Sequence, residues 1–153
     1  MPGVGGAIQS WGAGATEAWG AICVVEIHPS EFAQQASAVQ AEAPSSVRMS
    51  ALIDTGSDAS YMPSAFAERI GIVNLGLTPM SYTDGRQDMA GVYYVDLHFL
   101  GAERIVLKNV RILGQPWERD TSDPYEGIIG CPELSHGTFS YHGRERRWSF
   151  TAP

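Results

Sequence analysis

The residues best suited to chemistry are a carboxylate, a hydroxyl side chain and a glycine that follow one another in the chain. They are Asp54, Thr55 and Gly56, and they come directly after the apolar residues 51–53. An apolar strand carries the carboxylate to the end of a buried segment, and Gly56 allows a tight turn that brings its N–H toward that carboxylate. The Thr55 hydroxyl can donate to a neighbouring carbonyl and fix the turn. A buried carboxylate with such donors can stay ionised.

An ordinary turn is the plain alternative for this segment. Aspartate, threonine, glycine and serine all favour turns, and residues 54–57 consist of these types. An ordinary turn does not account for their position between a fully apolar strand and a short helix, which we predict over residues 63–70. Pro63 in the first turn and Gly71 as the stop define that helix.

Residues 52–58 resemble the active-site segment of retropepsin-like aspartic proteases. The predicted helix over 63–70 also fits that family. So does the apolar-apolar-glycine element at 128–130, which a predicted helix over 132–136 follows. The resemblance covers most of the chain, from about 22–150. It implies a mostly β fold, a retropepsin-like acid protease half-barrel with two short helices that is active as a symmetric dimer.

The resemblance implies that Asp54 is the catalytic residue of an aspartic endopeptidase, with Thr55 and Gly56 supporting the active-site loop. Peptide hydrolysis by this route uses two carboxylates that share one proton, of which one activates water and the other polarises the scissile carbonyl. The sequence contains Asp-Thr-Gly once and Asp-Ser-Gly nowhere. A homodimer would supply the second Asp54 across a two-fold axis. No metal or organic cofactor is implied.

A polypeptide substrate calls for a lid that excludes water and grips its backbone. The candidate lid is the hairpin over residues 82–91, whose turn contains Asp84 and Gly85. A surface hairpin with an Asp-Gly turn has the same pattern, so both interpretations stay open. We expect Ser57, Asp58, Asp84 and Gly85 to contact the substrate.

The residue after the apolar-apolar-glycine element departs from the family pattern. In retroviral members, an acidic residue at the position of Asp58 pairs with an arginine that follows this element, whereas here the following residue is Cys131. The pairing is therefore lost or replaced, and Asp58 either contacts substrate or only caps the turn. The missing arginine and a polar flap leave room for a second function, a non-catalytic retropepsin-like module for dimerisation or peptide binding. The intact Asp-Thr-Gly favours the enzyme.

Composition excludes several other classes of function. The chain has 153 residues, of which 44% are hydrophobic and 18% charged, as in one globular domain. The net charge of -7 disfavours nucleic-acid binding, which needs clustered positive charge. No apolar stretch is long enough for a membrane span and no signal peptide is evident, so we expect a soluble protein, with the cytoplasm as the default compartment. Cys23 and Cys131 do not make a disulfide framework, and the spacing of Cys131, His136 and His142 matches no common zinc pattern.

Local patterns divide the chain into a flexible Gly- and Ala-rich N-terminal arm over residues 1–20 and a protease-like domain over 21–153. Residues 28–46, rich in Ala, Gln, Ser and Pro, predict a long loop with room for one helical turn around 32–39. Alternating or β-branched segments predict strands at the following positions: 21–27, 47–53, 78–83, 91–100, 104–113, 126–130, 139–141 and 148–150.

Overall fold

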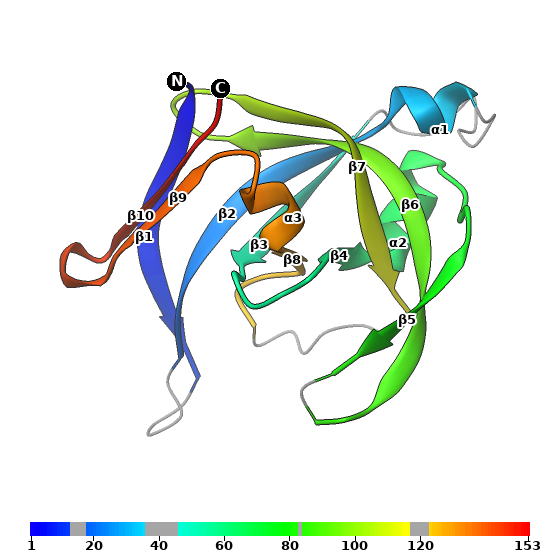
Figure 1. Cartoon of the computed structure of the whole chain (residues 1–153), viewed down its shortest axis with the longest axis horizontal. Coiled ribbons are helices and arrows are strands. Elements are labelled where there is room, and N and C mark those ends of the chain that lie inside the picture. The colour runs from blue at the N-terminus through cyan, green and yellow to red at the C-terminus, as the bar shows by residue number, and fades with distance from the viewer. Residues whose placement is uncertain (13–17, 36–45, 83, 117–122) are drawn as a thin grey trace.

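The chain forms a strand-rich fold in the computed structural model (Figure 1), which describes residues 1–12, 18–35, 46–82, 84–116 and 123–153. The strands are β1 (Gly3–Trp11), β2 (Ala18–Pro29), β3 (Val47–Ile53), β4 (Ser60–Pro63), β5 (Leu77–Ser81), β6 (Gln87–Leu100), β7 (Ile105–Gln115), β8 (Gly127–Ile129), β9 (Thr138–His142) and β10 (Arg147–Thr151). The helices are α1 (Glu31–Gln35), α2 (Ser64–Ile70), α3 (Cys131–Leu134) and the short 3-10 helix η2 (Gly143–Glu145).

The strands form one sheet that closes on itself. Its order is β5-β6-β7-β4-β8-β3-β2-β1-β10-β9, and β6 pairs with β2 as well as with β5 and β7. That extra pairing joins the two ends of the β6-β7-β4-β8-β3-β2 run into a closed barrel. The barrel is mostly antiparallel, with two parallel contacts, β3 with β8 and β4 with β7. Strands β1, β10 and β9 extend the sheet on one side, where the two termini meet (Figure 1).

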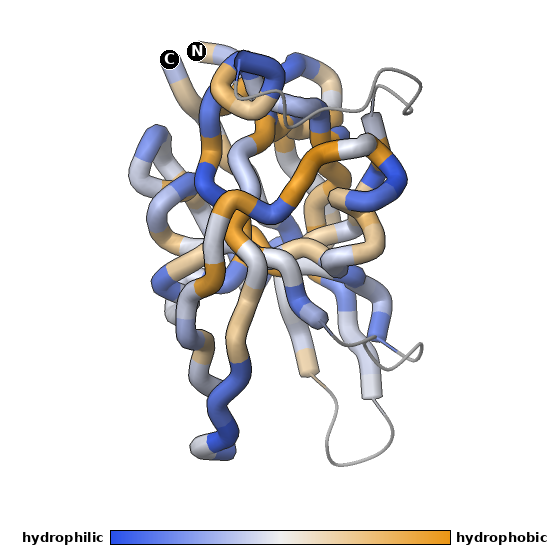
Figure 2. The backbone as a smooth tube through the Cα atoms, turned by 90° about the vertical axis from the view of Figure 1, so that its right-hand side faces the viewer, coloured by the Kyte–Doolittle hydropathy of each residue, from blue (hydrophilic) through white to orange (hydrophobic). Residues whose placement is uncertain are grey.

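Strand alternation builds the core. In β3 every second residue from Met49 to Ile53 is buried, and β6 alternates in the same way from Val95 to Phe99. The Phe99 ring contacts the Phe150 ring of β10, with centroids 5.5 Å apart, so the C-terminal hairpin packs on the barrel. Figure 2 shows hydrophobic residues along the barrel and hydrophilic residues at the tip of the β5–β6 hairpin. No helix among the described residues has the length and apolar character that a membrane crossing requires.

Helix α2 lies where the sequence predicts a helix. Helix α2 follows Pro63 directly and ends at Gly71, which adopts the left-handed conformation with φ of 73°. The two helices expected from the sequence, α2 and α3, are both present, and α1 is a third. Within the predicted long loop, α1 covers part of the expected helical turn, with the Ala33 N–H donating to the Ser30 hydroxyl at 3.1 Å. Residues 36–45 lie outside the described residues.

The expectation of a loose arm is wrong for residues 3–11. They form strand β1, which pairs antiparallel with β10 from Gly3↔Thr151 to Ala7↔Arg147 and then continues as a partner of β2. The glycines that suggested looseness allow close packing: a Cβ on Gly5 would lie 2.7 Å from the carbonyl oxygen of Trp148.

Candidate active site

The chain turns sharply at the end of β3, and Asp54 occupies the turn. The Asp54 N–H donates to the carbonyl of Ile129 at 2.9 Å, which ties the turn to β8. The Gly56 N–H donates to Asp54 Oδ1 at 2.9 Å, and the Ser57 N–H donates to the Asp54 carbonyl at 3.1 Å. The half-buried carboxylate is therefore held by the backbone of its own turn, as the sequence predicts for Gly56.

The apolar-apolar-glycine element forms the floor of this turn. Strand β8 lies parallel to β3, with Ile53 beside Ile129. A Cβ on Gly130 would lie 2.4 Å from the carbonyl oxygen of Ala59, so the loop and the floor approach each other too closely for any other residue. The loop after β3 and the end of β8, which are distant in the sequence, together hold the turn that carries the Asp54 carboxylate.

Cys131 fastens the loop at the position where the family pattern has arginine. Its N–H donates to the Ser57 carbonyl at 2.9 Å, and its thiol donates to the Thr55 carbonyl at 2.8 Å. Both contacts reach the loop backbone and neither reaches the side chain of Asp58. The Thr55 hydroxyl is exposed, and within the described part of the chain it makes no hydrogen bond that would fix the turn. Within one copy of the chain, the Thr55 hydroxyl therefore does not fix the turn as the sequence predicts.

Asp54 lines two cavities. The first has a volume of about 480 Å³ and contains four other predicted site residues, Gly56, Ser57, Asp58 and Asp84. The remaining residues of its wall are Tyr61, Met80, Ser81, Tyr82, Arg86, Gln115 and Ile128. The second has a volume of about 580 Å³ and is lined by Thr55 as well as by Asp54. Its other lining residues are Trp11, Ala18, Trp19, Gly20, Ala21, Leu52, Ile53, Phe139 and Tyr141.

The hairpin of β5 and β6 borders the first cavity, as expected for a flap (Figure 1). Its turn is closed by two backbone hydrogen bonds, from Tyr82 N–H to the Arg86 carbonyl at 2.9 Å and from Gly85 N–H to the Tyr82 carbonyl at 3.0 Å. Gly85 has a φ of 85°, which explains the glycine, but it is not part of the cavity wall. Thr83 lies outside the described residues.

The charge on the flap is partly compensated. Arg86 Nε donates to Asp84 Oδ2 at 2.7 Å, and the guanidinium lies 4.9 Å from the centre of the Tyr82 ring. The Arg86 backbone N–H, together with the nearby guanidinium, lowers the pKa of Asp84. Across the cavity, burial and then the charge of Asp58 raise the pKa of Tyr61, so its hydroxyl stays a hydrogen-bond donor.

The geometry described above agrees with the comparisons. A family model described as aspartyl protease matches residues 39–132, which is more than half of the 153 residues. The chain belongs to the aspartyl protease family. Its fold is similar to that in the crystal structure of a retropepsin-like aspartic protease from Rickettsia conorii, with a TM-score of 0.53 at 11% identity over 98% of this chain and 93% of that one. No curated protein matches the sequence. The retropepsin-like resemblance and the mostly β fold inferred from the sequence are confirmed.

In this member of the aspartyl protease family, sequence reasoning missed a buried polar pair beneath the loop. The Ser60 hydroxyl donates to the Glu133 carboxylate and accepts from the Gly130 N–H at 2.9 Å. Ser60 is fully buried and Glu133 is 5% exposed. Burial raises the pKa of Glu133, while the Ser60 hydrogen bond opposes that rise. The pair joins the end of the active-site loop to helix α3.

Metal-ligand side chains gather elsewhere in the protein. Among the described residues, the group close enough to hold one ion is Glu26, His28 and His98 on β2 and β6. Cys131, His136 and His142 are not part of such a group. The candidate site around Asp54 contains carboxylates, hydroxyl groups and backbone N–H groups.

Proposed function

We propose that this chain is an aspartic endopeptidase whose active site forms between two copies, each contributing Asp54. One observation carries the proposal: Asp54, held by the Gly56 N–H, lines two cavities. An extended polypeptide in the first cavity would lie beside the carboxylate, and a second copy placed against the second cavity would approach the same carboxylate. The membership in the aspartyl protease family supports this choice of chemistry.

The reaction requires a pair of carboxylates with one proton between them. The ionised Asp54 takes a proton from a water molecule, whose oxygen forms a bond to the carbonyl carbon of the scissile peptide. The protonated Asp54 of the other copy gives its proton to the carbonyl oxygen. When the tetrahedral intermediate collapses, the C–N bond breaks and the leaving nitrogen takes the proton that the first Asp54 had accepted from water. One hydroxyl group of the intermediate returns its proton to the second Asp54, so the pair again shares one proton. Two carboxylates about 3 Å apart cannot both ionise, so proximity alone sets up the acid and the base.

A homodimer is the simplest source of the second carboxylate. The sequence contains a single Asp-Thr-Gly, so one copy cannot supply both groups. Beside Asp54, the second cavity carries exposed Trp19 and Tyr141, at 46% and 49% exposure. Large exposed aromatic side chains next to an incomplete site are typical of a contact surface. We propose that a second copy covers this side and that the polypeptide substrate lies under the flap as an added strand.

The substitution Asp54→Asn tests the proposal. It removes the ionisable group and keeps the shape, so cleavage of an unfolded protein at mildly acidic pH should fall to background while the fold persists. The matched control is Asp96→Asn on β6, whose side-chain oxygen accepts from the Asn109 N–H at 2.9 Å and lies outside both cavities. Circular dichroism establishes that both variants fold. Wild-type cleavage rates in Asp54→Asn would refute the assignment.

The dimer has a test of its own. Activity per copy should fall on dilution in parallel with the sedimenting dimer, because the site exists only in the dimer. Activity from a monomer at all concentrations would contradict this part of the proposal. A wild-type protein that dimerises and binds peptides but cleaves none would instead indicate the non-catalytic module.

A further inference from the structure

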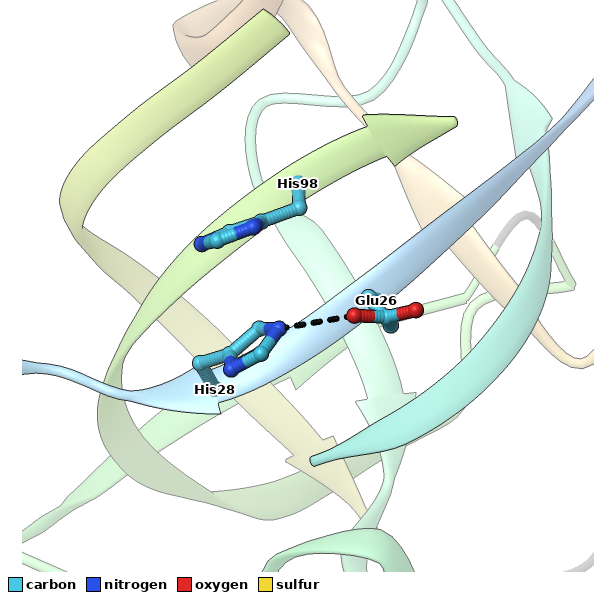
Figure 3. Close-up of side chains that lie close together, drawn as sticks. All are labelled: Glu26, His28 and His98. Carbon is cyan, nitrogen blue, oxygen red and sulfur yellow. Dashed lines mark hydrogen bonds and ion pairs between the residues drawn. The ribbon is translucent and has the colours of Figure 1, made fainter. Parts of the chain in front are cut away.

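Three potential metal ligands lie on the outward face of the barrel, away from Asp54. Glu26 and His28 are two residues apart on β2 and therefore point to the same face. His98 on β6 is the antiparallel register partner of Glu26. Figure 3 shows the two histidine rings on adjacent strands with the Glu26 carboxylate beside His28. The pairing of β2 with β6 is the one that closes the barrel.

The distances suit a three-ligand site. His28 Nε2 lies 2.9 Å from Glu26 Oε1, and the His28 and His98 rings are stacked with centroids 4.0 Å apart. One ligand atom from each of the three residues lies within 4.8 Å of the other two. Around a tetrahedral zinc ion with bonds of about 2.1 Å, ligand atoms are about 3.4 Å apart. Because a nitrogen lone pair lies in the plane of its ring, at least one of the two stacked rings must rotate about its side-chain bonds before all three ligands face one ion.

An orphaned nitrogen provides a second observation. His98 Nδ1 is buried and has no hydrogen-bond partner among the described residues, which is unusual for a buried polar atom. A bound metal ion is one way of giving an imidazole nitrogen of this kind a partner.

Nearby charges set limits on the affinity. Arg48 and Arg104 lie 3.4 Å and 3.6 Å from the Glu26 carboxylate oxygens, and their side chains are 72% and 55% exposed. These long, exposed arginine side chains can move aside into solvent and leave the Glu26 carboxylate open to a metal ion.

We propose that Glu26, His28 and His98 bind one zinc-type divalent ion and that this ion joins β2 to β6 at the closing seam of the barrel. Two histidines and one carboxylate are an established protein ligand set for zinc, with a fourth position for water. Because each strand contributes to the coordination, the bound ion opposes separation of the seam. The site is independent of peptide hydrolysis.

The proposal is tested by titrating the full chain with zinc chloride at neutral pH and measuring the heat of binding by calorimetry. We expect one ion per chain and a raised Tm. The double variant His28→Gln/His98→Gln should weaken binding by more than about 100-fold, since even residues outside the coordination shell are worth about 10–100-fold. The matched control is His136→Gln/His142→Gln, which removes the other two of the four histidines and should bind like the wild type. Asp54→Asn should also bind normally.

Equal affinity in the two double variants, no binding by the wild type, or loss of binding in Asp54→Asn would each overturn the proposal. X-ray absorption by the zinc-loaded wild type keeps the test decisive if the His28→Gln/His98→Gln variant fails to fold. The expected coordination shell contains two imidazoles and oxygen ligands. A shell without two imidazoles would overturn the proposal as well.

Discussion

We expect Ser60→Ala to destabilise the protein strongly, although it removes only one hydroxyl group. That hydroxyl lies in the buried polar pair beneath the loop that carries Asp54. The Ser60 Oγ accepts from the Gly130 N–H at 2.9 Å and donates to the Glu133 carboxylate, all in the protein interior. Alanine leaves the backbone N–H without its partner and takes one donor from a buried carboxylate. A buried donor left unpaired costs about 1–3 kcal/mol, and a hydrogen bond to a charged group contributes about 1.5–3 kcal/mol. Allowing for local relaxation, we expect a loss of about 3 kcal/mol at neutral pH.

The loss should depend on pH, and its sign follows from Glu133. Burial raises the pKa of Glu133 above its ordinary value of 4.5, so the folded state holds this proton more tightly than the unfolded state does. Its contribution to stability is therefore fully present below pH 4.5 and declines as pH rises through the folded-state pKa. The Ser60 hydrogen bond lowers that pKa, so its removal raises the pKa further and extends the decline. The difference between wild type and Ser60→Ala should be larger at about pH 8 than at about pH 5.

Urea unfolding followed by tryptophan fluorescence, at one protein concentration and at both pH values, measures this difference. Ser135→Ala is the matched control. Ser135 follows the last residue of α3, and its exposed hydroxyl donates to the Pro132 carbonyl. It should change the free energy of unfolding by less than about 0.5 kcal/mol. A Ser60→Ala protein as stable as this control, or one that loses more stability in acid than near neutrality, would refute the reasoning.

Two further substitutions probe the close packing of Gly137 against β10 and the ring contact in the flap. Gly137→Ala should lower the free energy of unfolding, measured with urea, by about 1–3 kcal/mol, because the new Cβ would lie 2.1 Å from the Thr151 carbonyl oxygen. The control Gly76→Ala should be neutral or stabilising, since a Cβ there would have no atom within 4 Å. Equal effects of the two substitutions would contradict the packing argument. Arg86→Ala removes the contact with the Tyr82 ring and should raise KM for peptide cleavage about two- to fivefold. The control Arg144→Ala, in η2, should leave KM unchanged. Identical KM values in the two variants would exclude a role for this flap contact.

The sequence was sufficient for the parts of the fold that local rules determine. Residues 47–53 were predicted as a strand and form β3, because alternation and apolar character agree there. Helix α2 was predicted from Pro63 and Gly71, whose conformational limits act within a few residues. The turn at Asp54 follows from Gly56 in the same way. For these elements, local preference and tertiary packing favour the same structure.

Contacts between distant segments could not be predicted in this way. Ser60 and Glu133 are 73 residues apart, and Glu133 has the appearance of an ordinary exposed residue on a short helix. Its burial depends on how α3 lies under β4, which no periodicity in four residues of helix can reveal. The Gly-rich β1 differs from its sequence-based prediction for a related reason: glycine weakens a strand taken alone, but it permits the approach of β10. The joining of Glu26 to His98 likewise depends on barrel closure.

The structure also explains how the active-site loop is held without the arginine of the family pattern. Two contacts from Cys131 hold the loop backbone at Thr55 and Ser57, and the Ser60–Glu133 pair holds its far end. Neither set of contacts uses the Asp58 side chain, which is exposed in the wall of the first cavity and has no ion-pair partner among the described residues. In a scaffold of this kind the arginine and the acidic side chain would neutralise each other. With thiol and hydroxyl donors supporting the loop, the charge of Asp58 stays directed at the space that a polypeptide would fill, which supports a role in substrate contact over one in capping the turn.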